Sequence, residues 1–510
     1  MAAKNTLLAA VLALAPGAFA AAQEAAPLSA IDWLDTLPPP TEPPGPSEPA
    51  ATVSASVPGV VVTPLDGPAA RRVGLVPADV TGLPDRLWSG ADGTALAARI
   101  AALPQLRLPA LQQLAFTLML AEATPPAGDT ARFDLARIDM LLAYGALDPA
   151  MALMAQAGMD TSPAHFARAI DMALIFGNTS TPCAVLRAQP RLSPGPGHDI
   201  LCAARSNDWS TAALLLGSAR VLELLPDAQV TALERFLDPE LFENDPDLPL
   251  PDAADPLMFR VFAAAGQPIP TRGLPVVYAN ADLSSTAGWK TQIEAAERLA
   301  QAGTLPGNRL LGLYSARQAA ASGGVWDRVR AVQRLETALN SRSASAVSKT
   351  LPTAWRLMGE QGLQVLFAGL FAEKLRPLVL SGAAADIAFD LLLLSPQYEA
   401  AEQVFPARAL RAPIYAAIAR GAVANTMTGT GREGAALRGF STADPDQEIV
   451  ALAQSGALGA AILETLSLAH AGSAGDVTAL ARALATLRAL GLEDVARRTA
   501  LQSMLLSGAT

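Results

Sequence analysis

Three glycines, Gly429, Gly431 and Gly434, have the GxGxxG spacing with which dinucleotide-binding enzymes hold a pyrophosphate. This fingerprint requires a buried strand before the first glycine, a helix after the last, and an acidic residue further along the chain that binds the ribose. The preceding residues, PIYAAIARGAVAN, instead indicate a helix that ends at Gly421. We therefore interpret the glycines as a loop between helices and expect no cofactor.

Nucleophilic catalysis requires a serine or cysteine beside a histidine base and an orienting acid. The chain has three histidines, His165, His198 and His470, and none accompanies a GxSxG nucleophile elbow. His165 and His470 lie in helical patterns, which favours a core or surface role. His198 opens a predicted helix, where we expect it to face solvent. The sequence therefore predicts no catalytic residues.

Carboxylate pairs are harder to exclude, because acidic residues are plentiful and the fold decides which of them meet. Glu294 and Glu297 lie one turn apart in a predicted helix, with Lys290 one turn before Glu294 and Arg298 next to Glu297. This pattern is typical of a charged helix face in contact with solvent. The alternative function is a cell-wall-acting hydrolase or lyase whose carboxylates are brought together by the fold.

An acidic, proline-rich stretch at 243–256 carries oxygen ligands of the kind that calcium prefers, but it lacks the EF-hand spacing with its central glycine. We expect a solvated loop and no metal. The acidic residues in and before this stretch are Glu240, Glu243, Asp245, Asp247, Asp252 and Asp255.

One further stretch is compatible with anion binding. Gly323 and Gly324 precede a predicted helix that begins near Val325, so free N–H groups at its start would face an anion, with Arg328 nearby. The alternative is a plain turn between helices with Trp326 packed inward. Both interpretations stay open at this level.

The first residues have the features of an export signal. Lys4 is followed by the apolar run TLLAAVLALAP and by a small-x-small site at 18–20, which predicts cleavage after Ala20 or Ala22. The run is shorter than the ~20 residues of a membrane-spanning helix, and no cysteine follows it for a lipid anchor. We expect residues 1–22 to be a signal peptide and the mature chain to be periplasmic, without stable membrane insertion.

The charge balance argues against nucleic acid as a partner. Acidic residues outnumber basic ones by 47 to 37, which gives a net charge of -10. No basic cluster is longer than a pair of arginines. A phosphate backbone would therefore be repelled.

Cys183 and Cys202 are the only cysteines, which favours a disulfide in an exported chain. Thr181-Pro182 starts one predicted helix, RLSPGPG is a loop, and HDILCAARS starts the next, so the cysteines meet if these helices form an antiparallel hairpin. Such a loop closure stabilises a fold by about 3 kcal/mol in the chain-entropy model. Two buried free thiols are the alternative, and the lack of a CxxC or zinc ligand set argues against chemistry.

Residues 23–88 differ from the rest of the chain. Their proline-rich segment TLPPPTEPPGPSEPAATVSASVPG predicts a disordered arm. Before it, LSAIDWLDTL places Ile31, Leu34 and Leu37 three apart with Trp33 beside them. This pattern suits either packing back onto the body or docking on a partner as a helix in a groove.

From about residue 89 onward, apolar residues recur every three or four positions, and pairs of a capping residue and a proline mark helix starts. Alternating strand patterns are nearly absent, and LPVVYANADL near Val276 is the best exception. The capping pairs are Asp148-Pro149, Ser162-Pro163, Thr181-Pro182, Asp238-Pro239, Asp255-Pro256 and Ser395-Pro396.

Two stretches, GALDPAMALMAQA and NDWSTAALLLGSA, begin with a polar turn and place alanines seven apart. The alanines are Ala150 and Ala157 in the first and Ala212 and Ala219 in the second. In this respect they resemble the second helix of tetratricopeptide repeats, where small residues let adjacent helices approach closely. The 34-residue period and the first-helix positions of that repeat are not matched. The resemblance implies a helical-hairpin architecture and a binding role, with no catalytic residues.

The sequence thus predicts an all-α protein, an irregular α-solenoid of antiparallel helical hairpins. Its N-terminal, central and C-terminal hairpins are expected at 89–245, 256–420 and 433–510. The predicted function is that of a periplasmic helical-repeat scaffold or adaptor that binds another cell-envelope protein, and no enzymatic activity is expected.

Overall fold

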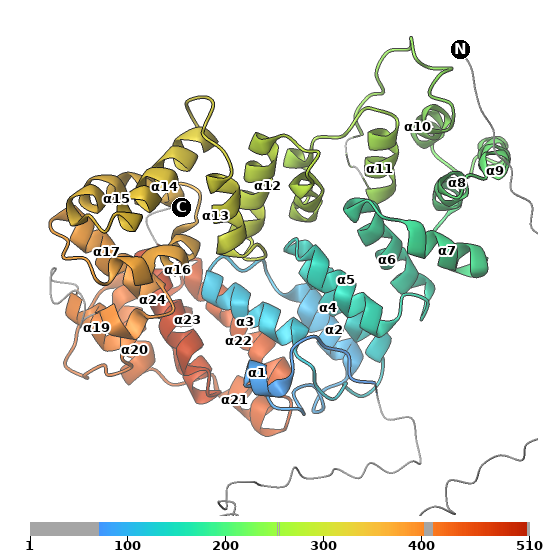
Figure 1. The fold of residues 1–510 in the computed structure, drawn as a ribbon. Coiled ribbons are helices and arrows are strands. Elements are labelled where there is room, and N and C mark those ends of the chain that lie inside the picture. The colour runs from blue at the N-terminus through green and yellow to red at the C-terminus, as the bar shows by residue number, and fades with distance from the viewer. Residues whose placement is uncertain (1–70, 252, 254, 402–411, 507–510) are drawn as a thin grey trace, which may run out of the picture. The chain divides into compact units, whose positions relative to one another are not determined.

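Every regular element in the described part of the chain is a helix (Figure 1), which confirms the all-α prediction. The computed structural model describes residues 71–251, 253, 255–401 and 412–506. No strand occurs within these ranges, although two isolated bridges join Val76 to Ala121 and Asp92 to Ala127.

The helices of the first part of the chain extend to residue 264. They are α1 (Ala78–Thr81), α2 (Gly93–Ala102), α3 (Pro109–Leu120), α4 (Thr130–Ala143), α5 (Leu147–Ala157), α6 (Pro163–Phe176), α7 (Ser180–Ala188), η2 (Pro190–Leu192), α8 (Pro196–Arg205), α9 (Trp209–Val221), α10 (Asp227–Leu237) and α11 (Pro256–Ala264).

The second part continues in the same manner, with three short 3-10 helices between the α-helices. Its elements are η3 (Thr271–Gly273), η4 (Val276–Leu283), α12 (Trp289–Gln301), α13 (Gly307–Ser315), α14 (Val325–Asn340), α15 (Ala344–Gly359), α16 (Gln364–Leu375), α17 (Ala383–Leu394), η5 (Tyr398–Ala400), α19 (Ala412–Ala419), α20 (Gly431–Ser441), α21 (Gln447–Gln454), α22 (Leu458–Ser473), α23 (Val477–Ala489) and α24 (Glu493–Leu505). The strand-like pattern near Val276 forms η4.

Side-chain caps start two helices where the sequence predicts them. Ser162 Oγ accepts the N–H of His165 at 3.3 Å, and the Asp255 carboxylate accepts the N–H of Met258 at 2.7 Å. A proline follows each cap at the first helical position, where its missing N–H costs nothing. These two starts, of α6 and α11, are confirmed.

The other four predicted pairs of a capping residue and a proline do not lie where a helix begins as predicted. At Asp148-Pro149 and Thr181-Pro182 the helices begin two residues earlier than predicted. At Asp238 and Ser395 a helix ends instead of beginning, so these two predictions are wrong. Ser395 Oγ donates to the carbonyl of Leu392 at 2.7 Å, because such side chains serve the end of a helix as readily as its start.

Many helices that follow one another in sequence pack on each other. Prominent contacts join α4 to α5, α5 to α6, α8 to α9, α14 to α15 and α22 to α23. The alanines spaced seven apart in α5 and α9 are buried at such contacts, namely Ala150, Ala157, Ala212 and Ala219. The architecture is therefore a solenoid-like stack of helical hairpins in which small side chains allow close packing.

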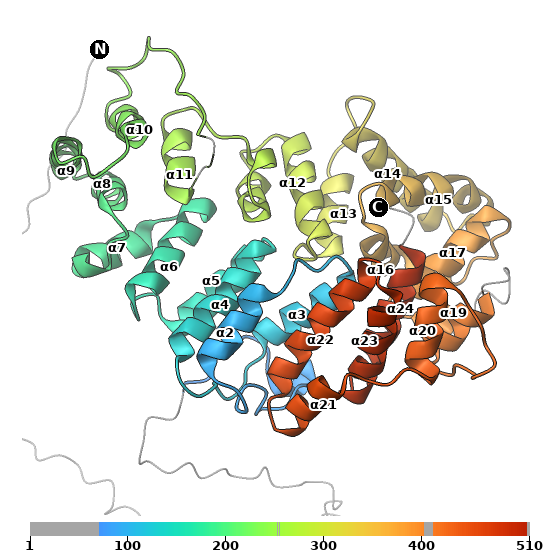
Figure 2. The ribbon, with the colours of Figure 1, turned by 180° about the vertical axis from the view of Figure 1, so that it is seen from behind.

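The last helices of the stack pack against the first ones, as seen from behind in Figure 2. Helix α22 contacts α2 and α3, and α24 also contacts α3. The N–H of Gly459 in α22 donates to the carbonyl of Leu87 at 3.0 Å. The N–H of Ala110 in α3 donates to Oε1 of the buried Gln502 at 2.9 Å. Segments almost 400 residues apart therefore share one core.

The described residues of the predicted arm belong to this core. Trp88 is 1% exposed, and its ring meets Phe133 edge-on with 4.9 Å between centroids. Val73 and Leu87 are buried as well. The packed body therefore begins at or before Val73, earlier than the boundary at residue 88 expected from the sequence.

Several predictions for the N-terminal region lie outside the described residues. These are the signal peptide at 1–22, the proline-rich segment and the docking residues Ile31, Trp33, Leu34 and Leu37. The described residues from 71 onward form one compact unit, which contains all three predicted groups of hairpins. None of the helices in this unit is long and apolar enough to cross a membrane.

Cys183 and Cys202 form a disulfide between α7 and α8, with 5.1 Å between their Cα atoms. Both residues are buried. The loop and the short helix η2 between them reverse the chain, as the predicted hairpin requires. The pairing expected from the sequence is present in the structure.

Replacing Gly459 with alanine tests the contact between α22 and the N-terminal core. The new methyl group would lie 2.5 Å from Cε3 of Trp88, so we expect the free energy of unfolding to fall by about 1–3 kcal/mol in urea denaturation. Gly312→Ala in α13 is the matched control, because its added methyl meets no atom within 4 Å. A Gly459→Ala protein as stable as the control would contradict this contact.

Candidate functional site

The predicted anion site at the start of α14 is filled by carboxylates of the chain itself. The N–H of Gly323 donates to Asp327 at 3.2 Å, and Nε of Arg328 donates to Oε1 of Glu297 at 2.8 Å. Gly324 follows with a positive φ of 54°, which forms the turn into the helix. The groups expected to hold an external anion thus have partners inside the chain.

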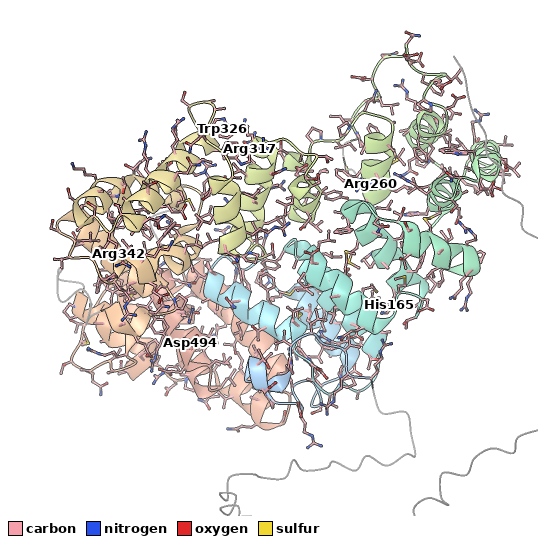
Figure 3. All side chains as sticks on the ribbon, viewed as in Figure 1. His165, Arg260, Arg317, Trp326, Arg342 and Asp494 are labelled. Atoms are coloured by element: carbon pink, nitrogen blue, oxygen red, sulfur yellow. A yellow bond between two sulfur atoms is a disulfide. The ribbon has the colours of Figure 1, made fainter. Side chains whose placement is uncertain are left out.

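Trp326 lies in the same turn and is labelled in Figure 3. Its ring is 4.9 Å from that of Trp289, measured between centroids, and Nε1 of Trp289 donates to the carbonyl of Leu313 at 2.9 Å. Trp326 is partly buried against the core. The turn with an inward-packed tryptophan, the alternative interpretation of this stretch, describes what the structure contains.

Glu297 is buried, so its assignment to a solvated charged face is wrong. Its side chain is 4% exposed. The Glu297 carboxylate accepts hydrogen bonds from Nε and Nη2 of Arg328 and from the hydroxyl of Tyr314, the last at 2.7 Å. The signal was present in the sequence. Glu297 lies four residues after Ile293 and three before Ala300, both of which are buried on the inner face of α12.

Burial shifts the pKa values of the side chains that contact Glu297. Burial and the neighbouring Glu297 carboxylate raise the pKa of Tyr314 well above its usual value, so the phenol stays protonated and donates. Burial alone would lower the pKa of Arg328, but its bonds to Glu297 outweigh this and raise it. The three side chains therefore form a fixed network: a carboxylate held by a cation and a phenol.

A polar cavity of about 620 Å³ opens beside this network. Its charged lining consists of Arg272, Arg298, Arg328, Asp282, Glu294 and Glu297. Glu294 pairs with Lys290 at 3.7 Å and Arg272 at 3.8 Å, while Asp282 accepts from the hydroxyl of Thr271. Arg298 donates to two backbone carbonyls. The acidic and basic side chains of this lining are thus paired with one another or with groups of the chain.

The three histidines lie apart from this cavity lining. His165, labelled in Figure 3, is buried in α6, and its Nδ1 is 2.9 Å from Ser162 Oγ. His198 is half-buried in α8 with its Nε2 shielded from solvent, so the expectation that it faces solvent is wrong. Burial lowers the pKa of His470 in α22. Of the two roles that the sequence left open for His165, the core and the surface, the structure shows the core.

Asp171 in α6 is the most strongly perturbed carboxyl group of the described chain. Burial raises its pKa to about 6, Arg168 opposes this shift, and the negative charge of Asp255 adds to it. Asp255 also acts on His198, whose pKa is lowered by burial and partly restored by this carboxylate. Asp171 lies in α6 and His198 in α8, while Asp255 caps the start of α11, which contacts both of these helices.

The remaining predicted motifs are structural. Gly429 lies in the loop before α20, Gly431 is the first residue of this helix and Gly434 lies inside it, so the prediction of a loop holds for the first of the three glycines only. In the acidic loop, Asp247 accepts from Gln267 at 2.8 Å, and Asp245 lies 4.0 Å from Arg235. Among the described residues, no group of three or more histidine, cysteine or acidic side chains is placed to hold a metal ion.

A shallow groove of about 590 Å³ runs between α2 and α4. Its floor is apolar and includes Ala97, Ala136 and Met140, while Arg132 and Asp139 lie along it. Small side chains widen the gap between the two helices here. The groove could accept an apolar group, but no catalytic side chains converge on it.

A second surface was not anticipated from the sequence. Of the ten large apolar side chains that the described residues leave exposed, seven lie between residues 209 and 250. We call this the α9–α10 surface; it comprises Trp209, Leu214, Val221, Leu222, Leu224, Leu241 and Leu250. Helix α9 is at the edge of the described helices in both views (Figures 1 and 2). Trp209, Leu214 and Val221 belong to α9, and the other four lie in the link before α10 and in the segment after it. Exposed apolar side chains that gather in one part of a protein are typical of an interaction site.

The segments that carry this surface are held together by specific contacts. Arg220 in α9 pairs with Glu234 in α10 at 2.8 Å, and the ring of Trp209 is 6.3 Å from that of Phe236. Arg235 in α10 donates to the carbonyl of Pro246 in the following loop. The signal in the sequence was the run AALLLGSARVLELL, which is apolar around the whole helix.

Comparison with models of protein families, with curated proteins and with solved structures finds no significant match to this chain.

Breaking the Glu297–Arg328 pair should be strongly destabilising. Arg328→Leu leaves a buried carboxylate without its cation, so we expect the free energy of unfolding to fall by roughly 3–5 kcal/mol. The double variant Glu297→Leu/Arg328→Leu should lose less free energy of unfolding than the two single variants lose together. The exposed pair Arg356 and Glu360 is the control, where removal should cost at most about 0.5 kcal/mol. Additive costs in the double variant would contradict the coupling.

The pKa of Asp171 predicts a dependence of stability on pH. Because its folded-state pKa of about 6 exceeds the ordinary value of 3.8, the folded protein binds this proton more tightly than the unfolded chain. Its contribution is fully present below about pH 4 and is lost as the pH rises through 6. Asp171→Asn should remove this component from denaturation curves measured between pH 4 and 7. An unchanged pH profile would contradict the shift.

Proposed function

We propose that this protein is a periplasmic scaffold that binds another cell-envelope protein through the α9–α10 surface. The observation that carries the proposal is the gathering of exposed apolar side chains between residues 209 and 250. A large exposed apolar patch is uncommon on a soluble protein, and where one occurs it commonly marks an interaction site. Helix α9 carries part of these exposed side chains, and a partner that covers it would account for their exposure.

Two features of the sequence support the periplasmic location. The N-terminal residues have the order of a signal peptide, with a basic start, an apolar run and a small-x-small site. The Cys183–Cys202 disulfide suits an oxidising compartment. The tetratricopeptide-like spacing of alanines in α5 and α9 adds a resemblance to proteins whose helical hairpins bind other proteins.

Charge substitutions on α9 test the proposal. Leu214 and Val221 are 70% and 79% exposed, so replacing both with glutamate should leave the fold intact while placing charges on the contact surface. In cells crosslinked before lysis, we expect this variant to lose at least one envelope protein that the unaltered protein captures. Val379→Glu is the matched control, because Val379 is 92% exposed on a different part of the chain.

The same experiment separates the surface from the N-terminal segment. A variant without residues 28–37 removes Ile31, Trp33, Leu34 and Leu37 and leaves the described body intact. Loss of the partner in this variant alone would assign docking to that segment instead of α9. Capture of identical proteins by the Leu214→Glu/Val221→Glu variant and the unaltered protein would overturn the proposal.

A further inference from the structure

The outer face of α9 has the composition of a helix-packing surface, and none of the described helices covers its exposed side chains. Leu214 and Val221 are seven residues apart and therefore lie on the same side, two turns from each other. Gly217 lies between them on that side. Both apolar side chains are exposed. This face is apolar at its two ends and has no side chain at its centre.

Gly217 has no role in packing within the described chain. A methyl group added there would meet no atom within 4 Å, and glycine is a weaker helix former than alanine. Some helical glycines pack closely within the chain, as Gly459 does against Trp88 and Gly439 against Leu484, whereas Gly312 and Gly369 are as open as Gly217. A glycine on a helix surface permits the close approach of a second backbone. A partner helix that crosses α9 at Gly217 would supply this second backbone.

The surroundings of this face are strongly acidic. Residues 209–250 contain eight aspartates and glutamates against two arginines, a net charge of -6 out of -10 for the whole chain. Both arginines are paired within the region, Arg220 with Glu234 and Arg235 with Asp245. Acidic side chains of the rim, among them Glu223, Glu240 and Glu243, are exposed.

The negative charge of residues 209–250 distinguishes between the kinds of molecule that would cover the face of α9. A second copy of the chain would bring two acidic rims together, and like charges across an interface disfavour association. An anionic lipid surface would be repelled for the same reason. A polypeptide with apolar residues on one side and lysine or arginine beside them would satisfy both the face and its rim.

We infer that the α9–α10 surface binds a basic amphipathic helix of the partner protein, which crosses α9 at Gly217 and places its cations against the acidic rim. The inference rests on the proposed function and specifies the chemistry of the partner. Apolar side chains at three- and four-residue spacing in the partner helix would contact Leu214 and Val221. Its lysines or arginines would lie near Glu223, Glu240 and Glu243.

Three synthetic helical peptides test the partner chemistry on the full mature protein. They share one apolar face and differ in their polar face, which carries lysine, glutamine or glutamate. By fluorescence anisotropy we expect the lysine peptide to bind at least about tenfold more tightly than the glutamine peptide. The glutamate peptide should not bind. The affinity for the lysine peptide should fall as salt is raised from about 0.05 to 0.5 M.

Two pairs of variants locate the contact. Gly217→Ala should raise the midpoint of thermal unfolding and weaken binding of the lysine peptide by about tenfold, because the methyl blocks close approach. Gly312→Ala should raise the midpoint without changing binding, since that glycine is equally open but lies on α13. Neutralising the rim by Glu223→Gln, Glu240→Gln and Glu243→Gln should weaken binding of the lysine peptide.

The control for the rim variant removes three exposed acids from other helices. It combines Glu373→Gln, Asp386→Asn and Glu448→Gln, which change the net charge equally and should leave the affinity unchanged. Equal weakening by both sets would indicate a general charge effect and would overturn the inferred site.

The outcomes distinguish the inference from the proposed function. Equal binding of the lysine and glutamine peptides, with no effect of salt, would overturn the basic partner while the α9 surface still binds protein. A dimer of the protein alone that Leu214→Glu dissociates would make a second copy the occupant and would also overturn the inference. If no peptide binds and Leu214→Glu/Val221→Glu captures the same envelope proteins as the unaltered protein, both proposals fail.

Discussion

The packing of α22 and α24 against α2 and α3 is the contact on which the rest of the described structure depends. In an open stack of helical hairpins, the first and last pairs each leave one apolar side without a neighbour. Here the two ends cover each other, with Trp88 lying against Gly459 and Gln502 capping the N–H of Ala110. The helices between them are thereby held at both ends, and the apolar excess that remains is concentrated on α9.

Charged groups inside the protein are satisfied by the chain itself. Arg137 is 1% exposed and donates to the carbonyls of Val73, Met119 and Ala121, which ties the segment before α1 to the end of α3. Glu297 is held by Arg328 in the same closed manner. Such buried groups must be fully paired to be tolerated. They therefore specify how the helices fit together.

The sequence sufficed for the fold class, for the disulfide and for the loop at Gly429, because periodicity, cysteine number and glycine spacing act locally. It failed where long-range packing decides the outcome. Glu297 looked like a surface acid beside Arg298, but its partner lies thirty-one residues away in α14. Trp88 was placed in the arm because its contact with α22 is set by the closure of the stack. The α9–α10 surface was missed because an apolar helix normally predicts burial.

The disulfide joins α7 to α8, and α8 packs against the helix α9 that carries part of the α9–α10 surface. Cys202 belongs to α8, on which α9 rests, and Cys183 belongs to α7, which leads back to the body. Before oxidation, noncovalent packing alone would hold this end of the molecule, and its local opening would be easier. In a newly made chain inside the reducing cell interior, the α9–α10 surface would thus be less well ordered. Under the proposed export to the periplasm, formation of this one covalent bond would then set its geometry, so that the proposed binding surface would take its final form only in that compartment.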